Sequence, residues 1–212
     1  IPALLEAVQA YYARIGVDFS IDDILITTGG SEALLIAMLC ILDEGSEILV
    51  PEPFYPNYHT FIRMAGGKIR PIRTMPEDGY RYATREQIEP QINEHTRAIL
   101  ITNPGNPTGT VLTQQELRLV ADIAKEHELY LICDEVYREF VYDGEKLTSV
   151  ASFRDIDENL ILIDSVSKRF SACGARIGAL LSRNRALMEN AMKYAQARLS
   201  VATLDQVGAA AL

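Results

Sequence analysis

The sequence predicts a layered α/β fold built on a largely parallel sheet. Short apolar runs of strand length alternate along the chain with longer stretches of helical periodicity. Polar or glycine-rich segments directly follow several of these runs, as they do at the carboxyl ends of strands in open α/β sheets. A length of 212 residues is enough for one domain with a substantial core.

The elements follow in order along the chain. The predicted strands cover residues 24–27, 47–50, 68–72, 98–102, 129–133, 159–163 and 177–181. The predicted helices cover 1–14, 32–42, 114–127 and 184–198, with one more leading to Ala65 and another starting near Thr84. Gly16 ends the first helix, and Thr113 is the expected N-cap of the helix that follows it. Residues 143–157 form a polar connection.

Charge and cysteine content narrow the class of protein. The net charge of -9 argues against nucleic acid and anionic membranes as partners. The three cysteines are far apart and odd in number, which argues against a disulfide framework or zinc site and fits a reducing, cytoplasmic compartment. The three histidines lack metal-ligand spacing, and the longest apolar run, 33–42, is too short to cross a membrane. Because both chain ends fall within helical patterns, we expect a piece of a longer protein.

Residues 164–176 gather hydroxyls, an amine and a guanidinium directly after the predicted strand 159–163. The amine of Lys168, set among cationic groups, can lose its proton and act as a nucleophile. A solvated surface loop explains the segment alone equally well. A Ser-x-x-Lys acyl enzyme with Ser165 as its nucleophile would also need Ser-Asp-Asn and Lys-Thr-Gly elements, which the sequence lacks.

Two further segments could contact an anionic, planar ligand. Residues 28–31, Thr-Gly-Gly-Ser, lead from a strand into a helix, where free N–H groups and the helix dipole favour an anion. They match neither a dinucleotide fingerprint nor a Walker A loop, and a plain turn with an N-cap is the simpler interpretation. Residues 51–58 form a proline-fixed aromatic loop whose rings either stack on a planar ligand or pack on the core.

Two polar segments follow the next strands. In residues 103–110, Asn106 can bond a ligand atom, whereas a role in turn geometry suits Asn103 better. Asp134 ends a buried strand and could hold a proton on a ring nitrogen, or simply cap a helix. An ATPase acidic element is rejected because the sequence has no phosphate-binding Gly-Lys-[Ser/Thr] loop. Because parallel strands end at one edge of a sheet, we expect these segments to meet there.

Together these segments resemble the fold-type I pyridoxal phosphate enzymes, specifically the class I and II aminotransferases of the aspartate aminotransferase type. The resemblance covers nearly the whole chain. It rests on Thr28–Leu34, Asn103–Gly109, Asp134–Tyr137 and Ser165–Lys168 continuing to Gly174–Gly178. It implies a three-layer α/β/α sandwich with a mostly parallel sheet of about seven strands, one of them antiparallel. Residues 1–212 would then be the cofactor-binding large domain, without the small domain made from both chain ends.

The resemblance also implies roles around the ring of pyridoxal 5'-phosphate. Lys168 corresponds to the residue that forms a Schiff base with the cofactor and moves the substrate proton. Asp134 would keep the ring nitrogen protonated. Asn106 and Tyr137 would bond the ring oxygen, and Tyr55 would stack on the ring.

The remaining positions correspond to the family's phosphate cup. These are Gly30, Ser31, Glu32, Ser165, Ser167 and Arg176. Backbone N–H groups of the first three would contact the phosphate, whereas the acidic side chain of Glu32 should not. Arg176 would be the charge partner of the phosphate.

The function implied is transfer of an amino group between an amino acid, aspartate or a similar one, and a 2-oxo acid, in amino acid biosynthesis. Family members are usually homodimers. The same residues would also suit a carbon–sulfur lyase or decarboxylase, and related domains serve as sensing halves of transcription regulators. The family's arginine for the substrate carboxylate belongs to the small domain, so we expect it to lie outside this stretch.

Overall fold

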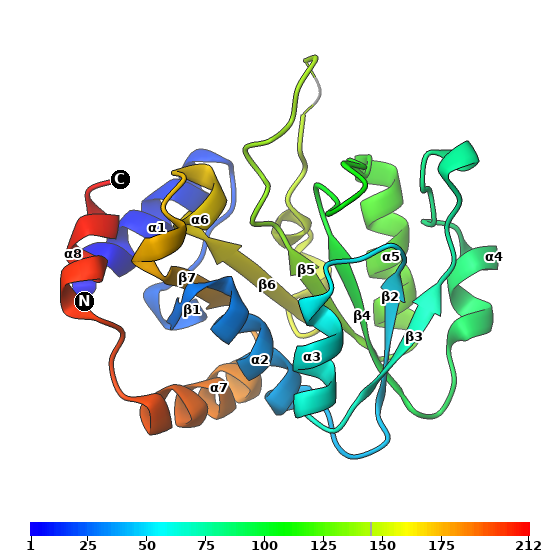
Figure 1. Ribbon diagram of the computed structural model, residues 1–212, viewed down its shortest axis with the longest axis horizontal. Helices are drawn as coiled ribbons and strands as arrows, with labels where there is room; N and C mark the ends of the chain where they lie inside the picture. The colour runs from blue at the N-terminus through cyan, green and yellow to red at the C-terminus, as the bar shows by residue number, and fades with distance from the viewer. Residues whose placement is uncertain (145) are drawn as a thin grey trace.

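A computed structural model of the protein describes residues 1–144 and 146–212, and within them the chain forms one seven-stranded sheet between two layers of helices (Figure 1). The strand order is β1-β7-β6-β5-β4-β2-β3. The strands are β1 (Ile24–Thr28), β2 (Glu47–Pro51), β3 (Lys68–Ile72), β4 (Thr96–Thr102), β5 (Tyr130–Asp134), β6 (Leu160–Ser165) and β7 (Ile177–Leu181). Only β7 runs antiparallel to its neighbours, β1 and β6. The predicted strands and the single antiparallel strand are confirmed.

Helices cover both faces of the sheet, which confirms the predicted three layers (Figure 1). One face carries α1 (Pro2–Arg14) and α5 (Gln114–Glu126). The other carries α2 (Gly29–Ile41), α3 (Asn57–Met64) and α7 (Arg185–Arg198). The shorter α4 (Arg85–Ile88), α6 (Val166–Arg169) and α8 (Thr203–Ala210) lie between or beside these, with α8 packed on α1.

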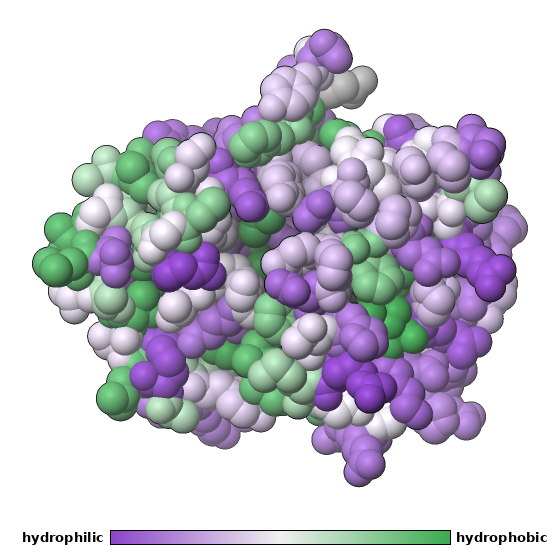
Figure 2. Space-filling model, viewed as in Figure 1, coloured by the Kyte–Doolittle hydropathy of each residue, from purple (hydrophilic) through white to green (hydrophobic). Residues whose placement is uncertain are grey.

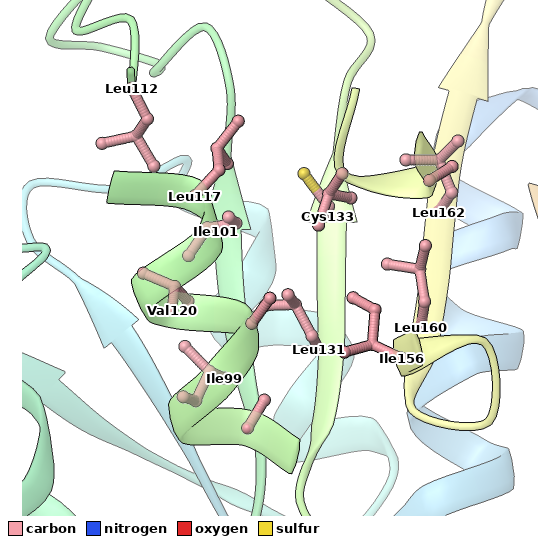
Figure 3. Close-up of a cluster of buried hydrophobic side chains, with 14 of the residues drawn as sticks. Ile99, Ile101, Leu112, Leu117, Val120, Leu131, Cys133, Ile156, Leu160 and Leu162 are labelled. Atoms are coloured by element: carbon pink, nitrogen blue, oxygen red, sulfur yellow. The ribbon is translucent and has the colours of Figure 1, made fainter. Parts of the chain in front are cut away.

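The two hydrophobic cores arise from alternation along the central strands. In β4, Ile99 and Ile101 face the layer that contains α5, where Leu117 and Val120 pack against them (Figure 3). Leu100, between them, belongs to the core beneath α2 and α3. Successive strand residues point to opposite faces, so a strand covered on both sides is apolar throughout. This is why short apolar runs without alternation predicted strands correctly.

Side-chain caps begin two of the long helices where the sequence indicated. Thr113 Oγ1 accepts the Glu116 N–H at 3.2 Å, and the Glu116 carboxylate accepts the Thr113 N–H at 2.7 Å, which is a complete capping box. The helix predicted from residue 184 begins one residue later, because Asn184 is its N-cap and accepts the Leu187 N–H at 2.9 Å.

The start of α2 differs from the prediction. The helix was expected from Glu32, yet it begins at Gly29, so the glycines form its first turn rather than a preceding loop. The carboxylate of Glu32 accepts the Thr28 N–H at 2.7 Å and thereby supports this earlier start. The predicted connection 143–157 includes residue 145, which lies outside the described residues, and its later part forms two 3-10 turns, Val150–Ser152 and Arg154–Ile156. In the described part of the chain no helix has the length and apolar character needed to cross a membrane.

Candidate active site

A cavity of about 160 Å³ lies beyond the carboxyl ends of β4, β5 and β6. It brings together all but one of the residues predicted for the site. These are Gly30, Ser31, Tyr55, Asn106, Asp134, Tyr137, Ser165, Ser167, Lys168 and Arg176. The topology explains the meeting, because the three strands are adjacent and parallel and end at the same edge of the sheet.

Arg176 reaches this edge by a different route. It precedes β7, and because β7 runs antiparallel, its first residue pairs with the last residue of β1. The start of α2 and Arg176 are therefore side by side. A Cβ added to Gly29 would lie 2.2 Å from Arg176 Nη2, so a larger residue there would force the guanidinium to shift. Gly29 has φ of +74° and Arg176 itself φ of 52°, both in the left-handed region.

These contacts create a cationic, donor-rich end of the cavity. Arg176 Nη1 donates to the Cys173 carbonyl at 2.9 Å, and Arg176 forms no ion pair with any described residue. Gly30 and Ser31 lie in the first turn of α2, where backbone N–H groups lack helical partners. A helix N-terminus beside an unpaired guanidinium suits a phosphate.

Glu32 is the one predicted site residue that does not line the cavity. Its carboxylate accepts the Thr28 N–H and forms an ion pair with Arg198 Nε at 2.8 Å. The negative charge is therefore neutralised away from the cavity. This geometry agrees with the expectation that the Glu32 side chain does not face a phosphate, and it leaves only the backbone N–H for that role.

Lys168 lies in the short helix α6, which starts where β6 ends. The Ser165 hydroxyl caps this turn by accepting the Ser167 N–H at 3.1 Å. Lys168 Nζ lies 5.7 Å from the centre of the Tyr137 ring, and no described residue forms a hydrogen bond or ion pair with it. The amine is thus directed to the cavity wall without a carboxylate partner.

Asp134 is almost completely buried at the cavity floor. Its Oδ2 accepts a hydrogen bond from the Tyr58 hydroxyl at 2.7 Å, and its Oδ1 accepts the Val136 N–H at 3.2 Å. Burial raises the pKa of Asp134 to about 6, although both hydrogen bonds oppose that rise. No cationic side chain in the described residues pairs with it, so the carboxylate suits a cationic N–H from a ligand.

Sequence reasoning missed several lining residues, of which Tyr58 and Thr102 contact the site's polar groups. The Tyr58 hydroxyl lies 2.6 Å from Thr102 Oγ1 and also bonds Asp134. Tyr58 stood within the aromatic segment, and Thr102 ended a predicted strand, but no sequence signal joined them to Asp134. The other missed lining residues are Leu34, Val136 and Cys173.

Asn103 and Asn106 lie in different environments, as the sequence suggested. Asn103 is fully buried, and its Oδ1 accepts the Leu112 N–H at 2.9 Å, which fixes the loop. Asn106 lines the cavity. Tyr55 is partly buried beside it, with its ring edge-to-face on Tyr58 at 5.5 Å and its hydroxyl bonded by the Asn57 amide.

The fold and cavity define an α/β domain with a cavity lined by a lysine and an arginine at the carboxyl edge of its sheet. More particularly, the chain belongs to the aminotransferase class I and II family, whose model matches residues 1–212. The resemblance drawn from the sequence is therefore confirmed at the level of the family.

Individual relatives agree with this assignment. The chain is 38% identical to aromatic-amino-acid aminotransferase 2 of Thermococcus litoralis over 157 residues, which cover 74% of this chain and 40% of that protein. It is 32% identical to aspartate aminotransferase of Pyrococcus horikoshii over 208 residues, covering 98% and 52%. The solved alanine aminotransferase of Pyrococcus furiosus superposes with a TM-score of 0.92 at 32% identity, covering 100% of this chain and 55% of that one. The chain thus spans about half the length of the relatives it matches.

Proposed function

We propose that the protein is a pyridoxal 5'-phosphate-dependent aminotransferase and that residues 1–212 form its cofactor-binding large domain. The observation that carries the proposal is that one cavity is lined by the amine of Lys168, the buried carboxylate of Asp134 and the guanidinium of Arg176, none of which forms an ion pair with a described residue. These groups match the aldehyde, the ring nitrogen and the phosphate of that cofactor. The names of the relatives, all aminotransferases, support the same reaction class.

When bound, pyridoxal phosphate supplies an electron-withdrawing ring that stabilises negative charge at the substrate α-carbon. Lys168 Nζ would hold the cofactor at its aldehyde carbon and, once freed from it, would move the proton of the substrate α-carbon. Asp134 would keep a proton on the ring nitrogen, while Asn106 and Tyr137 would bond the ring oxygen. Tyr55 would pack on the ring face.

The phosphate end of the cavity uses a second group of residues. Arg176 would neutralise charge, and the N–H groups at the start of α2 would donate hydrogen bonds, as would the hydroxyls of Ser165 and Ser167. Ser165 Oγ donates to Ile177 O and lies 2.8 Å from Ser167 Oγ, so the Ser165 hydroxyl would have to turn its single proton toward the phosphate. The backbone N–H of Glu32 completes the set.

The substrates we propose are an amino acid, with aspartate as the first donor to test, and a 2-oxo acid, in cytoplasmic amino acid biosynthesis. We also propose a homodimer. Hydrophobic residues gather at the end of the molecule where α8 lies (Figure 2). Leu204 and Val207 of α8 are 86% and 55% exposed, which is apolar surface that an association would cover.

The test uses the full-length protein, its absorption spectrum with pyridoxal phosphate, and reduction by borohydride. We expect a visible-edge band that reduction fixes onto the peptide containing Lys168, and transamination of aspartate with 2-oxoglutarate. In Lys168→Ala both should be lost. Retained transamination at near the original rate in that variant would refute the proposal. A labelled lysine with release of a thiol from a sulfur-containing amino acid, or of carbon dioxide, would instead indicate a carbon–sulfur lyase or a decarboxylase. A labelled lysine without turnover would indicate a sensing domain.

A further inference from the structure

The helix that carries Lys168 has only four residues, so its own hydrogen bonds do not hold it in place. The residue after the lysine, Arg169, turns away from the cavity and is mostly buried, with 11% of its side chain exposed. Its Nη2 lies 2.8 Å from both carboxylate oxygens of Asp164, a β6 residue. One face of this turn is therefore a cavity wall, and the other is a buried ion pair.

The carboxylate of Asp164 binds both ends of the turn. Its Oδ1 accepts the N–H of Ser165, immediately before α6, at 2.7 Å. The same carboxylate receives Arg169, the last residue of α6. The Asp164 side chain is 7% exposed. Lys168 thus lies between two anchored residues, and its Cα has little freedom relative to the sheet.

Helix α1 packs behind the Asp164–Arg169 ion pair, and α6 lies against α1 (Figure 1). The Tyr12 hydroxyl donates to Asp164 Oδ2 at 3.0 Å, and the Arg169 guanidinium carbon lies 3.7 Å from the centre of the Tyr11 ring. Tyr12 also accepts from Arg138 Nη2 at 3.3 Å. Arg138 is ion-paired with Glu135, the neighbour of Asp134. One helix therefore contacts both the lysine turn and the segment that follows Asp134.

Stability alone does not explain this arrangement. A buried ion pair loses much of its Coulombic gain to desolvation, and apolar residues of the same volume often stabilise a fold equally well. Among the described residues, Arg169 Nε has no hydrogen-bond partner although it is buried. What the pair supplies is orientation, because Nη2 is held by both carboxylate oxygens while the guanidinium stacks on the Tyr11 ring, and these contacts together favour one side-chain geometry.

We propose that Arg169 and Asp164 are positioning residues that hold the amine of Lys168 at its place in the cavity, with Tyr12 as their support. Neither residue touches the cavity itself, since neither lines it. Their effect acts through the backbone of α6. The consequence for turnover rests on the proposed function, whereas the consequence for the Lys168 amine does not.

The chain contains a matched control in Arg183. Its side chain is 9% exposed, it pairs with Asp157 at 2.7 Å, and its guanidinium carbon lies 4.4 Å from the Phe19 ring centre. It follows β7, whose antiparallel direction places its carboxyl end at the opposite edge of the sheet from the cavity. Arg183 also donates to the Asp18 and Ala151 carbonyls, so its loss should cost at least as much stability without reaching Lys168.

The experiment compares Arg169→Met, Arg169→Lys, Asp164→Asn and Arg183→Met in the full-length protein. The first readout is the rate at which acetic anhydride acetylates Lys168 in the cofactor-free protein, followed by peptide mass spectrometry. Because a loosened turn exposes the amine, we expect this rate to rise at least about threefold in Arg169→Met. We expect it to stay within about twofold of the original in Arg183→Met.

The second readout is the split between kcat and KM. A misplaced amine should lower kcat about ten- to a hundredfold in Arg169→Met, with KM for the amino donor changed less than about threefold. Arg169→Lys should recover part of this loss. Unchanged acetylation and kcat in Arg169→Met, or equal losses in Arg183→Met, would overturn the proposal.

Two safeguards keep the test decisive. If Arg169→Met does not fold, Asp164→Asn retains the shape and still accepts the Ser165 N–H, and an unaltered Lys168 reactivity in it would equally overturn the proposal. If the unchanged protein never attaches pyridoxal phosphate, the proposed function fails, yet the acetylation series still decides whether the ion pair positions Lys168.

Discussion

Replacing Asp134 by asparagine tests whether the buried charge of this carboxylate lowers the free energy of unfolding. A ligand that pairs with the carboxylate would restore that stability. The change removes the charge and keeps the volume. Burial raises the pKa of Asp134 from 3.8 to about 6 in the folded chain. At about 1.4 kcal/mol per unit, keeping it ionised costs the folded protein about 3 kcal/mol at neutral pH. Asparagine avoids that cost but weakens the Tyr58 hydrogen bond, worth about 1 kcal/mol, so the variant should gain about 1 to 2 kcal/mol.

The direction in which stability changes with pH depends on whether the folded or the unfolded chain holds the proton of Asp134. Between pH 3.8 and about 6 the folded state holds a proton on Asp134 that the unfolded chain has lost. Stability therefore falls as pH rises through this interval, and the full penalty is present above it. The advantage of Asp134→Asn should be small near pH 4 and reach its full size near pH 7.

Urea unfolding of the cofactor-free protein at pH 4.5 and pH 7.5 measures this difference. Tyr58→Phe is the companion variant: because the Tyr58 hydrogen bond lowers the pKa of Asp134, its loss should steepen the pH dependence. Cofactor affinity of Asp134→Asn should nevertheless fall, since a neutral amide cannot pair with a protonated ring nitrogen. An equal stability difference at both pH values, or a variant less stable at pH 7.5, would refute the reasoning.

Three further predictions concern the phosphate end and the scaffold. Arg176→Ala removes the unpaired guanidinium, so affinity for pyridoxal phosphate, measured by fluorescence titration, should fall roughly ten- to a hundredfold, as expected for one charge-assisted contact; unchanged affinity would exclude Arg176 from the site. Gly29→Ala adds a Cβ 2.2 Å from Arg176 Nη2 at a positive φ, and should lose about 1 kcal/mol or more in urea unfolding together with cofactor affinity. Thr113→Ala breaks the capping box with Glu116 and should cost about 1 kcal/mol, while cofactor affinity stays unchanged; loss of affinity there would contradict the assignment of the site.

The strands of the sheet were predictable because each leaves its own pattern in the sequence. A strand buried on both faces is apolar along most of its length, so short apolar runs indicated β4, β5 and β6. The start of α2 was set too late because glycine ordinarily disfavours a helix, whereas here Gly29 begins the helix at a positive φ, against the guanidinium of Arg176. The low helix propensity of glycine was outweighed by a tertiary contact with Arg176, which cannot be predicted from the local sequence.

The candidate site was predictable only in part for the same reason. Residues that end strands could be assigned to one edge, which located Asp134, Asn106 and Lys168. The groups that orient them come from distant parts of the chain. Tyr58 is 76 positions from Asp134, and Tyr12 is 152 from Asp164. No sequence motif predicts contacts between residues so far apart, because these residues meet only when the helices pack on the sheet.

Three departures from local rules lie at the cavity that contains Lys168. Asp134 is buried without a cation, Arg176 has a left-handed backbone and no carboxylate, and Lys168 has no polar partner among the described residues. Each departure lowers the stability of the fold or leaves a charge without a partner among the described residues, and a single ligand with a cationic ring, a phosphate and an aldehyde would pair with all three side chains. Binding of such a ligand would therefore stabilise the folded state more than binding at a site whose charged groups already have protein partners. The Arg169–Asp164 pair lies behind this cavity rather than in it, and it holds Lys168 in that arrangement through the backbone of α6.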